Sequence, residues 1–141
     1  MYLRQSQLLT HAGALIVLQG AIAKAEEMQV PQSIAVVDPS GNLLAFIRMD
    51  GAKFLSQMSA THKAVTAASS RAKTGDVPSE TATKLALTMG QRFSNLPGGL
   101  PIEIDGQVVG AVGAGSGTDD EDVEVSEAGI AALIKALKNN G

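Results

Sequence analysis

The chain has 141 residues, of which 45% are apolar, and its formal net charge at pH 7 is −3. This length suits one domain, residues 1–141. Because acidic residues outnumber basic ones, the composition excludes a protein that binds the phosphate backbone of nucleic acids. The absence of cysteine excludes disulfides, zinc fingers, iron–sulfur clusters and thiolate nucleophiles. No apolar run approaches the ~20 residues of a membrane span, and the first residues lack the features of a secretory signal, so we expect a cytoplasmic protein.

The first predicted element is a long helix from residue 6 to about residue 28. Its large apolar residues recur at helical spacing and are Leu8, Leu15, Leu18 and Ile22. The helix should end before Pro31, because the residue that precedes a proline is pushed out of the α region. Further apolar side chains widen this stripe, so we expect the helix to have two packing partners.

Two β-hairpins are predicted, one on each side of a helical middle region. The apolar runs 33–38 and 43–48 are joined at Asp38-Pro39-Ser40-Gly41, which suits a type I turn. The runs 102–104 and 107–112 flank Asp105-Gly106, a dipeptide typical of a two-residue type I′ turn. Because an isolated hairpin is marginally stable in water, the two hairpins should join in one antiparallel sheet.

Three more helices complete the predicted order of elements. They cover residues 54–72, residues 79–91, and a final stretch to about residue 138 that begins with a capping box at Thr118 and Glu121. Residues 92–101 are expected to form a loop. Both sides of the strands are apolar, so helices should cover both faces of the sheet. The sequence therefore predicts an α+β fold in the order helix, hairpin, helix, helix, hairpin, helix.

Several segments, in order along nearly the whole chain, resemble the GlcG and HbpS family. The matching segments are 34–43, 48–52, 63–64, 98–102, 106–113, Asp122 and 128–129. This family is often labelled haem-degrading and includes the C-terminal domain of PduO-type corrinoid adenosyltransferases. The chain looks most like the short stand-alone members, among them the OrfY-type proteins associated with glycerol and diol metabolism. The resemblance implies a profilin-like fold, a homo-oligomer and, in some members, binding of haem or a related tetrapyrrole.

His11 is the candidate ligand for a haem iron. A protein that binds haem needs an apolar slot, cations or amides for the propionates, and commonly an axial His, Met, Tyr or Cys. His11 lies three residues after Leu8 and seven before Leu18, which predicts an imidazole on the apolar face of the first helix. Residues of the first helix serve as haem ligands in relatives of this family. The alternative is a histidine covered by a neighbouring element or subunit, with no iron bound.

Arg48 and Lys63 are the candidate groups for the acid side chains of the tetrapyrrole. Arg48 ends the second strand, and its guanidinium can bind a carboxylate through two hydrogen bonds; the alternative is an ion pair with Asp50 that fixes the turn. Lys63 occupies a position of the family motif on a helix of small residues. It either neutralises a propionate or extends between subunits. Its neighbour His62 is interpreted as an amphipathic interface position.

The glycine-rich segment 113–117 carries no assigned chemistry. It departs from the Gly-Val-Ser-Gly-Gly pattern of the family, which leaves the role of Ser116 open. A nucleotide is not expected there, because the lysine of a P-loop is missing and the acids at 119–122 would repel phosphate. The segment is not a nucleophile elbow either, and no catalytic residue is named.

Two functions therefore stand side by side after the sequence analysis. The first is an accessory protein that binds haem, or a corrinoid, with His11 on the metal and Arg48 and Lys63 on the acid groups. The second is a homo-oligomeric structural or interaction module that assists diol, glycerol or glycolate metabolism without a cofactor. Degradation of haem by the protein rests on the family resemblance alone.

Overall fold

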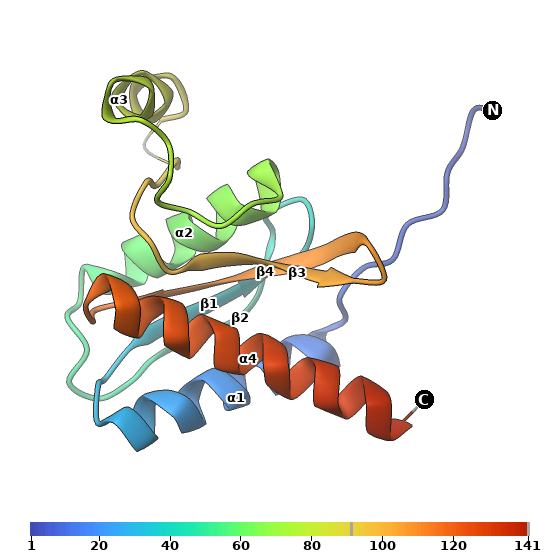
Figure 1. Ribbon diagram of the computed structural model, residues 1–141, viewed down its shortest axis with the longest axis horizontal. Coiled ribbons are helices and arrows are strands. Elements are labelled where there is room, and N and C mark those ends of the chain that lie inside the picture. The colour runs from blue at the N-terminus through green and yellow to red at the C-terminus, as the bar shows by residue number, and fades with distance from the viewer. Residues whose placement is uncertain (91, 141) are drawn as a thin grey trace.

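The computed structural model, which describes residues 1–90 and 92–140, is a four-stranded antiparallel sheet with helices on both faces (Figure 1). The elements are α1 (His11–Met28), β1 (Ser33–Val37), β2 (Leu43–Arg48), α2 (Ser56–Ser70), α3 (Ser79–Thr88), β3 (Gly99–Ile104), β4 (Gln107–Gly115) and α4 (Asp119–Asn140). Helix α2 covers one face of the sheet, α1 and α4 cover the other, and α3 stands apart beyond α2 (Figure 1). The predicted α+β class and order of elements are confirmed. No helix in this described part of the chain is long and apolar enough to cross a membrane.

The two hairpins join in one sheet, as predicted, and the strands that pair between them are β1 and β4. The strand order is β2-β1-β4-β3, and β1 pairs antiparallel with both β2 and β4. Every residue of β1 is buried, and successive residues face different layers. Ile34 and Val36 pack in the core shared with α1 and α4, whereas Ala35 and Val37 pack against α2. The sequence of β1 is therefore apolar because helices cover both faces of the sheet at this strand.

The turns and the start of α4 have the predicted geometry. The Asp38 carboxylate accepts hydrogen bonds from the backbone amides of Ser40 (2.8 Å) and Asn42 (3.0 Å), which holds the first hairpin turn. At the second turn, Asp105 and the following glycine have positive φ angles of 50° and 80°. At the start of α4, the Thr118 amide donates to Glu121 Oε1 (2.8 Å), and the Glu121 amide donates to Thr118 Oγ1 (3.3 Å). These local signals predicted the structure because both partners lie within four residues of one another.

Helix α1 begins at His11, five residues later than predicted. Thr10 is the N-cap residue, and its hydroxyl accepts a hydrogen bond from the Gly13 amide at 3.1 Å. The preceding residue, Leu9, donates its amide to the carbonyl of Val109 in β4 at 2.9 Å. The segment before α1 is therefore extended and attached to the sheet, and Leu8, which suggested a longer helix, is 64% exposed.

Other predicted boundaries also differ from the structure. Helix α2 covers Ser56–Ser70 rather than 54–72, and α3 ends at Thr88, while the predicted end at Gln91 lies outside the described residues. Strand β3 already begins at Gly99, within the predicted loop, because Gly99 and Thr74 hold each other through two hydrogen bonds. Pro101 is accommodated in β3 because this strand lies at the edge of the sheet.

Glycines set the spacing between the layers. A Cβ atom at Gly20 of α1 would lie 2.5 Å from Ala132 Cβ of α4, and one at Gly129 of α4 would lie 2.7 Å from the Val17 carbonyl. On the other face, a Cβ at Gly113 of β4 would overlap the Ala60 carbonyl of α2. The helices therefore pack with their backbones close to the sheet and to each other.

We predict that Gly113→Ala lowers the free energy of unfolding by at least ~2 kcal/mol, because the added methyl group meets helix backbone rather than a movable side chain. Gly13→Ala is the matched control, since its new Cβ meets only the tip of the flexible Leu9 side chain. Urea unfolding followed by circular dichroism measures both. Equal stabilities of the two variants would contradict this packing argument.

Candidate functional site

The three predicted site residues lie in different parts of one chain. His11 is the first residue of α1, and Lys63 lies on α2, across the sheet from α1. Arg48 ends β2 opposite Ser33, which in turn pairs with Gly115 at the far end of β4. The start of α1, by contrast, is attached near the beginning of β4. A single subunit therefore does not bring His11, Arg48 and Lys63 around one ligand.

The side chain of His11 is exposed, whereas the sequence predicted that it lies on the apolar, covered face of α1. The buried stripe of this helix consists of Ala14, Val17, Leu18, Ala21 and Ala25, so small residues make most of the contact. His11 continues this stripe by helical spacing, but as the first residue of the helix it is exposed. Leu15, which was expected on the same face, is 46% exposed. The predicted environment of His11 is therefore wrong, although its imidazole stays available for a ligand.

Lys63 is a structural residue within one subunit. Only 3% of its side chain is exposed, and its ammonium donates hydrogen bonds to Asp122 Oδ2 and to the Ala114 carbonyl, both at 2.9 Å. The other Asp122 oxygen, Oδ1, accepts from the Gly117 amide at 3.0 Å. Two roles were predicted for Lys63, binding a haem propionate and extending between subunits. The structure agrees with neither role, because the charge of Lys63 is already neutralised inside the protein. The sequence missed the partner because Asp122 is 59 residues away.

Arg48 has an exposed side chain at the end of β2. In the part of the chain that the structure describes, it forms no ion pair with Asp50, so such a pair does not fix the turn that follows. The turn is held instead by its backbone, where the Ala52 amide donates to the Met49 carbonyl at 3.0 Å. Gly51 supplies the positive φ angle of 89°. Arg48 therefore has a free guanidinium at the end of the sheet away from His11.

An apolar groove lies at the start of α1, and it is the hollow nearest to His11. Its first part has a volume of about 330 Å³ and is lined by Leu8, Leu9, Thr10, Gly13, Ile104, Val109, Leu133 and Leu137, with Gln7 at its edge. A second part of about 340 Å³ shares Ile104 and Leu137 and extends to Lys138. His11 follows the lining residue Thr10 directly but is not itself among the lining residues. We call these two parts together the α1 groove.

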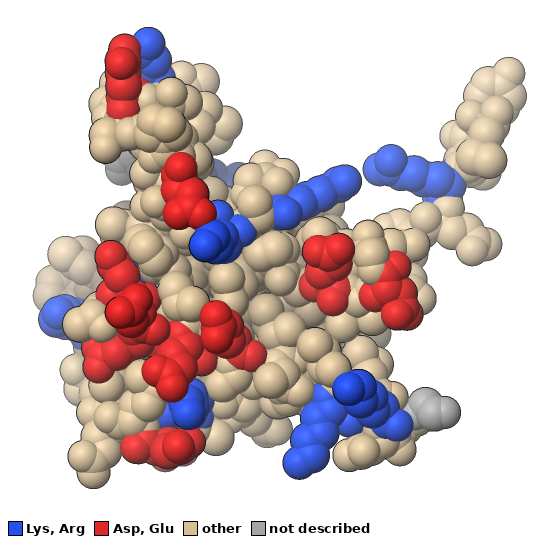
Figure 2. Space-filling view, in the orientation of Figure 1, with Lys and Arg blue, Asp and Glu red and all other residues tan. Residues whose placement is uncertain are grey.

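Charges of both signs surround the α1 groove. Its outer part is lined by Glu103 and Asp105 on the β3–β4 hairpin and by Lys138 on the last turn of α4. Figure 2 shows Lys and Arg gathered near the C-terminal end of the molecule, whereas Asp and Glu gather near the start of α4. An acid group in the groove would therefore be favoured on the α4 side. The sequence did not predict the groove because its walls come from segments far apart in the chain.

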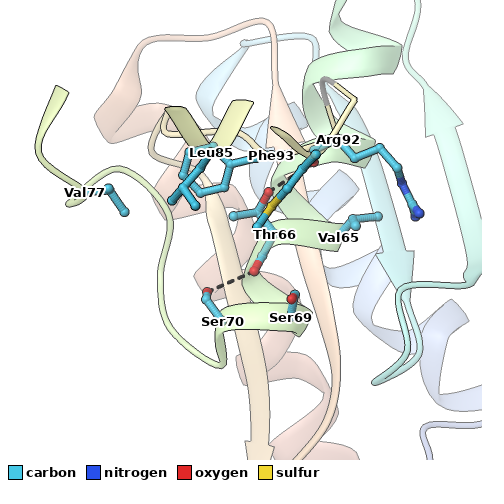
Figure 3. Close-up of a pocket in the computed structure, with 9 residues that line it drawn as sticks. Val65, Thr66, Ser69, Ser70, Val77, Leu85, Arg92 and Phe93 are labelled. Carbon is cyan, nitrogen blue, oxygen red and sulfur yellow. Dashed lines mark hydrogen bonds between the residues drawn. The ribbon is translucent and has the colours of Figure 1, made fainter. Parts of the chain in front are cut away.

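A second apolar hollow of about 390 Å³ lies between α2 and the segment around α3 (Figure 3). Leu85 and Phe93 close it on one side, and Thr66 and Val65 of α2 form the other (Figure 3). The Ser70 hydroxyl donates to the Thr66 carbonyl at 2.9 Å, so this part of the wall has its hydrogen bonds satisfied within the chain. The residues described around this hollow include Arg92, and none of them lines the α1 groove.

Within residues 1–90 and 92–140, no three His, Asp or Glu side chains gather closely enough to hold a metal ion.

Comparisons with known proteins identify the family. The family model described as "Haem degrading protein HbpS-like" matches residues 9–131. The chain belongs to this family. An uncharacterized 15.0 kDa protein from the dhaT-dhaS intergenic region of Citrobacter freundii is 36% identical over 132 residues, which cover 90% of this chain and 93% of that protein.

Solved structures confirm the fold of the HbpS-like chain. The crystal structure of Klebsiella pneumoniae protein ORFY has a TM-score of 0.89 at 31% identity and covers 95% of this chain and 96% of its own. A crystal structure described as a PduOC–haem complex has a TM-score of 0.81 at 23% identity and covers 89% of this chain and 94% of its own. The family resemblance predicted from the sequence is therefore confirmed.

We predict that Lys63→Met lowers the free energy of unfolding by about 3–5 kcal/mol, because it leaves the Asp122 carboxylate buried without its cation. Lys24→Met is the matched control, since Lys24 also pairs with a carboxylate of α4, Glu124, at 3.4 Å but near the surface. The control should cost less than ~1 kcal/mol. Urea unfolding measures both, and a Lys63→Met variant as stable as the control would show that the buried pair is dispensable.

Proposed function

We propose that this protein binds haem in the α1 groove, with the imidazole of His11 as a ligand of the iron. The observation that carries the proposal is that His11 is exposed and directly follows Thr10, a residue that lines an apolar groove. Among the described residues, His11 has no hydrogen-bond or ion-pair partner, so either ring nitrogen is free to coordinate.

The lining of the α1 groove fits a flat apolar ligand. Leu9, Val109, Leu133 and Leu137 supply aliphatic surface, and burial of such surface contributes roughly 25 cal/mol per Å². Haem supplies iron within an apolar plate that carries two propionates. The chain would hold the plate against these side chains and would place an acid group toward Lys138 rather than toward the carboxylates of the hairpin.

The groove is open, and a second subunit would cover the other side of the plate. Leu8 is 64% exposed and Leu137 is 47% exposed, so both keep apolar surface available for a neighbour. The family description supports a haem protein, and the PduOC–haem complex supports the idea that this fold can hold haem. Arg48 and Lys63 have no part in this proposal within one subunit, since both lie away from the groove.

Haem titration tests the role of His11. We expect the wild-type protein to give a saturable shift of the Soret band, and His11→Ala to weaken binding at least tenfold, about 1.4 kcal/mol. His62→Ala is the matched control, because the chain has only these two histidines and His62 lies on α2, across the sheet from the groove. Its affinity should equal that of the wild type.

Two results of this titration would contradict the proposal in different ways. Equal affinity of His11→Ala and the wild type would remove His11 as the ligand. A saturable shift with a corrinoid such as cobinamide, but not with haem, would replace haem by the alternative tetrapyrrole. In that case the groove would remain the binding site if Val109→Glu abolished the shift, since this variant places a carboxylate among the lining residues.

A homo-oligomeric interaction module is the second candidate function, and exposed apolar side chains favour it. Leu87 on α3 is 81% exposed, and Phe54 and Leu55 before α2 are 73% and 63% exposed. Helix α3 stands apart from the sheet and its other helices (Figure 1). Side chains of this kind are unfavourable in water unless another surface covers them.

We predict that sedimentation velocity at micromolar concentration gives a species larger than the 14.4 kDa chain. Leu87→Glu should shift the distribution toward the monomer, because it places a charge on the apolar surface of α3. Thr83→Glu, on the same helix, is the control and should sediment as the wild type. A wild-type protein that is strictly monomeric would contradict the interaction module and also the covering subunit of the haem proposal.

A further inference from the structure

A polar hollow of about 280 Å³ lies where the start of α2 meets the connection between β4 and α4. Its walls carry Lys53, Ser59, Lys63, Ser116, Asp119 and Asp122. The hollow is at the Gly115 end of β4, whereas the α1 groove is near Val109 at the other end. It is therefore a separate place on the molecule, and more of its lining residues are polar, although Leu55 and Leu96 also line it.

Some hydrogen-bond donors in this polar hollow have no acceptor among the described residues. The Lys63 ammonium has three N–H donors and uses two of them on Asp122 and the Ala114 carbonyl. The Ser116 hydroxyl accepts from the Lys53 amide at 3.0 Å, which leaves its own hydrogen free to donate. The Lys53 side chain is exposed and, among the residues that the structure describes, has no ion pair. The hollow thus presents a free cation and two further donors.

A buried amide beside the hollow lacks hydrogen-bond partners. The Gln32 side chain is fully buried, and neither its nitrogen nor its oxygen is hydrogen-bonded. A Cβ atom at Gly117, which lines the hollow, would lie 2.5 Å from Gln32 Nε2 and 2.9 Å from Asp122 Oδ1. The amide therefore lies directly behind the wall of the hollow. A buried polar group without a partner is costly, so the wall of the hollow at Gly117 is backed by an amide whose hydrogen-bonding capacity is unused.

The backbone of Ser116 is also unusual. Its φ angle is +96°, a conformation that side chains other than glycine rarely adopt. Glycine would relieve the strain but would remove the hydroxyl that holds the Lys53 amide. The strained residue therefore orders the segment that carries the free cation. Such strain persists where the surrounding structure supports it and is concentrated at binding sites.

We propose that the polar hollow binds a small hydroxycarboxylate. The carboxylate of the ligand would face the Lys53 ammonium, the Ser116 hydroxyl and the remaining N–H of Lys63, because all three are donors and one is a free cation. The Asp119 carboxylate, on the same wall, accepts a hydrogen bond from the hydroxyl of the ligand. Asp122 is already paired with Lys63 and Gly117, so its charge is balanced inside the protein. The acids at the start of α4 disfavour a multiply charged phosphate, but the Lys53 ammonium can balance the single charge of a carboxylate. The volume suits a ligand of a few carbon atoms.

Three compounds with three carbon atoms each test this assignment by amide chemical shifts in nitrogen-15 NMR spectra. L-lactate has the carboxylate and the hydroxyl, propionate lacks the hydroxyl, and 1,2-propanediol lacks the carboxylate. We expect L-lactate to shift the amides of Ser116, Gly117 and Asp119 saturably, with a dissociation constant at least tenfold lower than those of the other two compounds. Shifts near Thr10 and Gly13, at the α1 groove, are not expected, so the result is independent of haem binding.

Two lysine variants test whether the Lys53 ammonium binds the carboxylate of the ligand. Lys53→Gln should raise the dissociation constant of L-lactate at least fivefold, whereas Lys73→Gln, whose side chain is 68% exposed on another loop, should leave it unchanged. Both variants replace surface side chains, and the same spectra report whether each is folded. The proposal is overturned if L-lactate gives no saturable shift, if propionate or 1,2-propanediol binds as tightly, or if Lys53→Gln binds L-lactate like the wild type.

Discussion

The buried ion pair between Lys63 and Asp122 is the interaction on which the arrangement of the layers depends. A lysine and an aspartate taken out of water lose hydration, and only close pairing with further hydrogen bonds compensates for this loss. Here the ammonium also binds the Ala114 carbonyl, and the carboxylate also binds the Gly117 amide. The pair therefore connects α2, the end of β4 and the start of α4 at one point, where any shift of a layer would leave a charge unpaired.

Glycines make this connection possible by letting the backbones approach. A Cβ atom at Gly98 would lie 2.8 Å from the Ala114 carbonyl and 3.1 Å from Lys63 Nζ, and one at Gly99 would overlap the Lys63 carbonyl. Residues 98–99 and 113 thus bring β3 and β4 directly under α2. The same construction gives the molecule two different ends. Ion pair and polar hollow lie at the Gly115 end of β4, while the apolar groove and His11 lie at the start of α1.

Local signals predicted most of the fold, and long-range contacts account for what was missed. The Asp38 turn and the capping box at Thr118 are held by hydrogen bonds over a few residues, and the Asp105 turn depends on the positive φ angles of two adjacent residues, so short patterns suffice to predict them. The start of α1 could not be predicted in this way, because the Leu9 amide is held by Val109 from the other half of the chain.

The site was predicted less well, for two physical reasons. The spacing of apolar residues placed His11 in line with the buried stripe of α1, to which Ala14 and Ala21 belong, but it could not show that the first residue of the helix is exposed. A lysine in a helix of small residues suggested a ligand or a subunit contact, whereas its partner Asp122 comes from a distant helix. Family likeness identified Lys63 and Asp122 as motif positions without showing that they bind each other.

A double-mutant cycle on Lys63 and Asp122 tests the central role of this pair most directly. The free energy of unfolding is measured for the wild type, Lys63→Met, Asp122→Leu and the double variant. If the two side chains act as one buried unit, the double variant loses far less stability than the sum of the single variants, with a coupling energy of at least ~2 kcal/mol. Additive losses, with a coupling energy near zero, would contradict the account, because each residue would then act on the fold without the other.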